Sequence, residues 1–88
     1  MEKSDIRKIL KNPSKELVDL ALGYVNLTEK ERTIIEYTEI KGISEERTAE
    51  LMCLSTRHLQ KIKREAINKI SEVWTYTKLI SIMLKEMD

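Results

Sequence analysis

Glycine and proline, the residues that most often shape tight turns, are almost absent from this chain. It contains two glycines and one proline among 88 residues. A β-sheet domain of this length needs many turns, and so few of these residues cannot supply them. The length allows one small domain, and 41% hydrophobic with 35% charged residues is typical of a folded protein. We therefore predict an all-α fold, a helical bundle of five to six helices.

Hydroxyl side chains predict where several of these helices begin. Thr28 and Glu31 fit a capping box, in which each side chain bonds the backbone of the other residue. Gly42 fits the position just after a helix end, where φ is often positive. Serine and threonine suit the first position of a helix because their oxygens accept free backbone N–H groups. The predicted helix starts of this kind are Ser14, Thr28, Ser44 and Ser55.

Charge is distributed unevenly, although the chain as a whole has a net charge of +1. Residues 27–54 carry four basic and seven acidic residues, whereas residues 55–70 carry five basic and one acidic residue. A concentrated basic helix is typical of a surface that binds phosphates. A solvated helix face that happens to be basic is the alternative.

Residues 44–62 have the layout of a helix-turn-helix. Ala49 is small enough for two helices to cross closely, and Cys53 marks the turn four residues later. Leu59 and Ile62 then form an apolar stripe on the second helix. Its opposite face carries side chains that donate hydrogen bonds, which is what a helix in the major groove of DNA requires. These residues are Thr56, Arg57, Gln60, Lys61 and Arg64.

The stretch from residue 27 to residue 70 resembles region 4 of the bacterial sigma-70 family, and it is also similar to the DNA-binding domain of LuxR-type response regulators. The recurring elements are Leu-Thr-x-x-Glu-Arg at 27–32, Gly-Ile-Ser at 42–44, Thr-Ala at 48–49 and Leu-Ser at 54–55. The basic helix then follows without a gap. The resemblance covers about half of the chain. It departs from the family at Cys53, where glycine or a small polar residue is common.

The resemblance implies a sequence-specific regulator of transcription that reads double-stranded promoter DNA in the major groove. It implies base reading by Thr56, Arg57, Gln60 and Lys61. It implies phosphate contacts by Arg47, Thr48, His58 and Arg64, and Lys63 of the same basic stretch is a further candidate. Region 2 of a sigma factor does not precede the motif, so we expect a stand-alone regulator of the phage or mobile-element type. RNA polymerase is a second candidate partner.

Three segments are expected: N-terminal helices in residues 1–26 that pack on the core, the DNA-binding domain in residues 27–70, and an apolar helix in residues 71–88. The last segment has more apolar side chains than one small domain needs. We expect it to form a homodimer that presents two helices to a palindromic site. Folding back onto the N-terminal helices is the alternative. The residues assigned to the dimer are Val73, Trp74, Ile80, Leu84 and Met87.

Catalytic and metal-binding constellations are missing from the sequence. One cysteine and one histidine exclude a disulfide framework and most metal sites. There is no phosphate-binding glycine loop and no paired catalytic group. We therefore expect no enzyme activity, no metal and no cofactor.

We also expect a cytoplasmic protein without a membrane segment. The alternative function is a protein-interaction module, such as an adaptor or an anti-sigma-like decoy, that keeps the fold without binding DNA.

Overall fold

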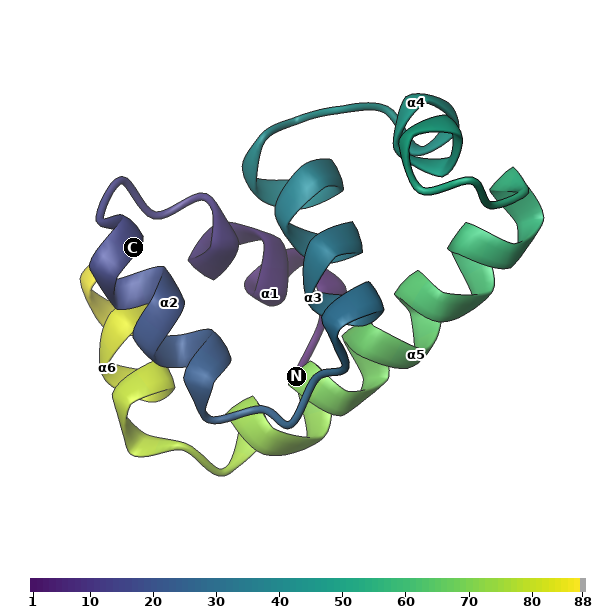
Figure 1. Ribbon diagram of the computed structural model, residues 1–88. Helices are drawn as coiled ribbons and strands as arrows, with labels where there is room; N and C mark the ends of the chain where they lie inside the picture. The colour runs from purple at the N-terminus through teal and green to yellow at the C-terminus, as the bar shows by residue number, and fades with distance from the viewer. Residues whose placement is uncertain (88) are drawn as a thin grey trace. The chain divides into compact units, whose positions relative to one another are not determined.

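The structure, a computed structural model, describes residues 1–87, with side chains as far as Glu86. These residues form six α-helices and one π-helical segment and contain no strand (Figure 1), which confirms the all-α prediction. None of these helices is both long and apolar enough to cross a membrane. The elements are α1 (Lys3–Leu10), α2 (Lys15–Gly23), α3 (Glu29–Ile35), η1 (Glu36–Ile40), α4 (Glu45–Leu51), α5 (Thr56–Thr75) and α6 (Lys78–Met87).

The chain divides into two compact units. The central unit is Leu27–Ala66, and the terminal unit combines Met1–Asn26 with the chain from Ile67 onward. Helix α5 is continuous, so its first part belongs to the central unit and its last part to the terminal unit (Figure 1). The central unit ends at Ala66, within α5, and this helix continues to Thr75.

Side-chain hydrogen bonds form at the four predicted helix starts. The Thr28 hydroxyl accepts the Glu31 N–H at 3.2 Å, and the Glu31 carboxylate accepts the Thr28 N–H at 2.8 Å. This completes the capping box. The hydroxyls of Ser14, Ser44 and Ser55 each accept a backbone N–H three residues further on, at 3.3, 3.1 and 3.1 Å. The beginnings of α2 to α5 were therefore encoded locally.

Helix α3 continues into the wider π-helical turn η1, which the sequence did not predict. The Lys41 N–H donates to the Glu36 carbonyl, five residues earlier, at 2.8 Å. The Thr38 hydroxyl donates to the Ile34 carbonyl at 2.7 Å, which gives that backbone oxygen a side-chain partner. The helix then ends at Gly42, whose φ of 71° is the left-handed conformation expected there.

The terminal unit has a fully apolar core. Trp74 is completely buried, and its indole Nε1–H donates to the Ala21 carbonyl at 2.8 Å. Helices α1 and α6 pack against each other. The buried residues of this unit are Ile6, Ile9, Leu10, Val18, Ala21, Leu22, Val25, Ile70, Trp74, Ile80 and Met83. Helices α1, α2 and α6 and the end of α5 all contribute to this core.

The side chains assigned to a homodimer lie mostly inside this core. Trp74 and Ile80 are buried within one chain, and Val73 and Leu84 are half-buried. The side chain of Met87 lies outside what the structure describes. Trp74 and Ile80 therefore offer no surface to a second copy, because the C-terminal helix packs on α1 of its own chain. The homodimer itself stays a prediction.

Candidate nucleic-acid interface

A small apolar cluster holds α4 and the beginning of α5 in place. Ile34, Ala49 and Leu59 are buried together, and Met52, Leu54 and Ile62 pack against them while remaining partly exposed. Ala66 is also buried, one further step along the same side of α5. The sequence predicted an apolar stripe at Leu59 and Ile62; Leu59 is fully buried, and Ile62 is half-buried. One side of α5 is thereby committed to the core, so the opposite side faces solvent.

The turn between α4 and α5 is a Schellman motif. The Leu54 N–H donates to the Ala49 carbonyl at 2.8 Å, and the Cys53 N–H donates to the Glu50 carbonyl at 3.1 Å. Cys53 occupies the left-handed position of the motif with a φ of 57°. Leu54 and Ala49 also meet in the apolar cluster, which is the hydrophobic contact that usually accompanies the motif. This turn fixes where α5 begins.

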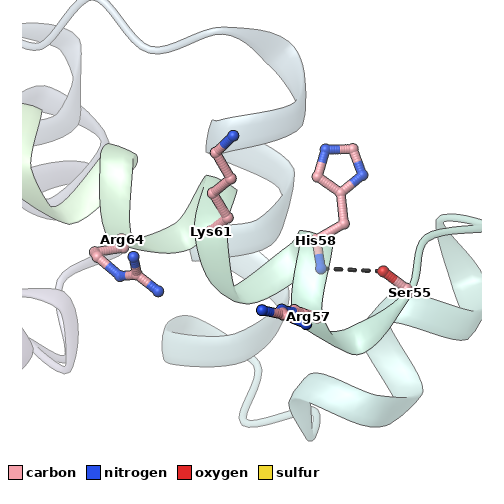
Figure 2. A pocket seen from close by; sticks show the side chains of 5 residues that line it. All are labelled: Ser55, Arg57, His58, Lys61 and Arg64. Carbon is pink, nitrogen blue, oxygen red and sulfur yellow. Dashed lines mark hydrogen bonds between the residues drawn. The ribbon is translucent and has the colours of Figure 1, made fainter.

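A surface cavity of about 430 Å³ lies along the exposed side of α5. Figure 2 shows the residues that line it, with the dashed bond from the His58 backbone N–H to the Ser55 hydroxyl. Arg57, Lys61 and Arg64 follow at spacings of four and three residues, so they lie on one face of the helix. The cavity is lined by Ser55, Arg57, His58, Lys61 and Arg64.

The cationic side chains of this cavity have no acidic partners within the described residues. Arg57, Lys61 and Arg64 are exposed, and none of them takes part in an ion pair or a side-chain hydrogen bond there. Three positive charges on one short face repel one another. This face is therefore suited to a ligand that carries several negative charges.

Lys63, on the next side of the same helix, differs from these cations. Its side chain is only 14% exposed, and its Nζ lies 3.0 Å from Glu39 Oε1 and 3.1 Å from Glu45 Oε2. The ammonium group thus links α5 to both η1 and α4. Because two carboxylates already pair with this charge, the ion pairs argue against the phosphate contact expected from the sequence. The acidic partners were missed, since both glutamates lie far from Lys63 in the sequence.

Thr48 and Arg47, two other predicted phosphate contacts, also have protein partners. Thr48 is buried, and its hydroxyl donates to the Ser44 carbonyl at 2.8 Å, so this side chain cannot reach a phosphate. Arg47 is exposed but pairs with Glu50 at 3.1 Å. An exposed pair of this kind is weak and can exchange its partner readily.

Thr56 and Gln60, two of the predicted base-reading residues, lie at the edges of the cationic face. Gln60 is exposed, and its Nε2 donates to Glu45 Oε1 at 3.2 Å. Thr56 is half-buried at the first position of α5. The structure therefore keeps Arg57, Gln60 and Lys61 on the surface as predicted, with Gln60 held from α4.

Comparisons with known proteins found no relative of this chain. No protein-family model, no curated protein and no solved structure was found to match the chain. The resemblance to sigma-70 region 4 therefore stays an interpretation of the sequence motifs, and the function has to be inferred from the side chains themselves.

Proposed function

We propose that the protein is a sequence-specific, double-stranded DNA-binding regulator of transcription, of the sigma-70 region 4 type. In this proposal α4 and α5 act as a helix-turn-helix. Helix α5, which Ser55 caps, enters the major groove with the face that carries Arg57, Lys61 and Arg64. The observation that supports it most directly is the face of Arg57, Lys61 and Arg64, which is cationic, exposed and without acidic partners among the described residues.

The dimensions and charge of this face suit duplex DNA. Arg64 lies seven positions after Arg57, which corresponds to about 10 Å along a helix. The major groove is about 12 Å wide and is flanked by a phosphate charge for about every 1.7 Å of helix axis. Binding would place the three cations in the negative field of the phosphates, which offsets their mutual repulsion, and each direct phosphate contact would release counterions.

Roles follow from exposure and from hydrogen-bonding chemistry. Arg57 and Lys61 can donate to the acceptors of guanine, and Gln60 can bond adenine with both ends of its amide. We assign base reading to these three residues, with Thr56 at the edge. Phosphate contacts are assigned to Arg47, His58 and Arg64. Thr48 and Lys63 leave the interface for the reasons given above.

The test compares two neighbouring charge-removing variants, Arg64→Gln and Lys63→Gln. Duplexes selected from a random pool would be titrated at several salt concentrations, well below the unfolding temperature of each variant. Arg64→Gln should weaken binding to every sequence and reduce the salt slope by about one unit, because one phosphate contact is lost. Lys63→Gln should leave the slope unchanged, because Lys63 contacts Glu39 and Glu45.

A third variant tests base reading. Arg57→Ala should weaken binding to the selected duplex by about 5- to 150-fold and leave binding to a scrambled duplex much less affected. A chain that shows no preference among duplexes and no response to Arg64→Gln would contradict the proposal and favour a protein-interaction module.

A further inference from the structure

Glu45 connects the predicted base-reading face to the rest of the central unit. Its Oε1 accepts the Gln60 Nε2–H at 3.2 Å, and its Oε2 lies 3.1 Å from the Lys63 Nζ. Lys63 in turn contacts Glu39 at 3.0 Å. Since Glu39 is only 9% exposed and Lys63 14%, the far end of this network is anchored in the protein. Gln60 stands at its exposed end.

The bond to Glu45 fixes which way the Gln60 amide faces. A side-chain amide has a donor end and an acceptor end, whereas an ionised carboxylate only accepts hydrogen bonds. The NH₂ group of Gln60 must therefore face Glu45, which leaves Oε1 and the second N–H for a ligand. The Hoogsteen edge of adenine offers one acceptor, N7, and one donor, the N6 amino group. An amide with one oxygen and one N–H to offer is complementary to that edge.

We propose that Glu45 is a positioning residue that sets the base preference of Gln60, so that an adenine is selected at one position of the bound duplex. The inference rests on the proposed function. Holding the amide before binding reduces the side-chain freedom lost in the complex, which favours the matching base. Lys63 neutralises much of the charge that Glu45 would otherwise bring close to DNA, and it orients the carboxylate through the second oxygen.

Glu46 provides a matched control for this proposal. It is the next residue of α4, is exposed, and carries the same charge as Glu45. Glu45→Gln and Glu46→Gln each remove one negative charge from the same helix turn, so both should strengthen binding to any duplex slightly. Both variants replace a group that only accepts with an amide that can also donate, but only Glu45 contacts Gln60, so only Glu45→Gln lets the Gln60 amide turn over.

The experiment measures binding of a set of duplexes that differ at single base pairs, derived from the sequence that the wild-type protein selects. Wild type and Glu46→Gln should prefer adenine at one position by about 5- to 150-fold over the other bases. Gln60→Ala should abolish that preference, and Glu45→Gln should reduce it by at least about fivefold. Adding Glu45→Gln to Gln60→Ala should change the preference no further, because Glu45 acts through Gln60.

The outcomes separate this inference from the proposed function. A wild-type protein that prefers no duplex overturns both together. A wild-type preference that survives intact in Glu45→Gln, or an adenine preference that survives in Gln60→Ala, overturns the positioning role alone and leaves DNA binding standing. An adenine preference that falls equally in Glu45→Gln and Glu46→Gln also overturns the positioning role, because the effect would then come from charge and not from the Gln60 contact.

Discussion

Different kinds of contact stabilise the inside of each of the two units of the molecule. Most of the large apolar side chains that are fully buried, Trp74 among them, belong to the terminal unit. The central unit has a small apolar cluster of Ile34, Ala49 and Leu59. Its other fixed points are polar: the capping box at Thr28, the Schellman turn and the ion pairs of Lys63.

The difference suggests a division between stability and recognition. Apolar burial contributes about 25 cal/mol per Å² and has no directional preference, so a large core is an effective source of stability. Hydrogen bonds and ion pairs contribute less but fix orientation. The unit that carries Gln60 and Arg57 uses the directional contacts, and the unit that carries no residue assigned to DNA binding uses the large core.

The largest effect expected from this comparison follows removal of the Trp74 ring. Trp74→Ala should reduce the free energy of unfolding by about 3–5 kcal/mol, because it leaves a cavity in the terminal unit. Urea unfolding followed by far-ultraviolet circular dichroism measures the loss. Trp74→Phe is the control, because it keeps most of the ring volume but loses the hydrogen bond to Ala21. It should reduce the free energy of unfolding by less than Trp74→Ala does. An unchanged urea midpoint in Trp74→Ala would remove the basis for calling this core the main source of stability.

A second, smaller effect should separate two lysines of α5. Lys63→Met removes a cation that contacts Glu39 and Glu45 and should cost about 1–3 kcal/mol of stability, since two carboxylates lose a partner. Lys61→Met removes an exposed cation and should change stability by less than about 0.5 kcal/mol. Thermal unfolding of both variants beside wild type makes the comparison. Equal effects would mean that the ion-pair network does not support the central unit.

Local features of the fold were predictable, because they depend on residues close together in the sequence. The caps at Thr28 and Ser55, the helix end at Gly42 and the apolar stripe at Leu59 all follow from side-chain type and spacing. The exposed positions of Arg57, Gln60 and Lys61 follow from the same stripe, since they lie on its opposite side.

Long-range contacts were not predictable in the same way. Lys63 was expected on the phosphate surface because its neighbours in sequence are basic, yet its partners are Glu39 and Glu45 on other elements. Trp74 was expected in an interface, because periodicity marks an apolar face without saying what covers it. The π-helical turn η1 has no marker that distinguishes it from an ordinary helix end.

The smallest effect concerns the turn of the central unit. Cys53 adopts a φ of 57°, in the left-handed region that β-carbons disfavour by about 1–2 kcal/mol. Cys53→Gly removes this cost, while the greater freedom of glycine in the unfolded chain returns about 0.5–1 kcal/mol of it. We therefore expect a net stabilisation of about 0.5–1 kcal/mol, measured as a higher urea midpoint. Cys53→Val should act in the opposite direction, because a β-branched side chain fits this conformation worst. A destabilised Cys53→Gly would show that the exposed thiol makes contacts in the folded protein that outweigh the strain of its backbone. The backbone hydrogen bonds and the φ of this turn would then not be enough to explain its stability.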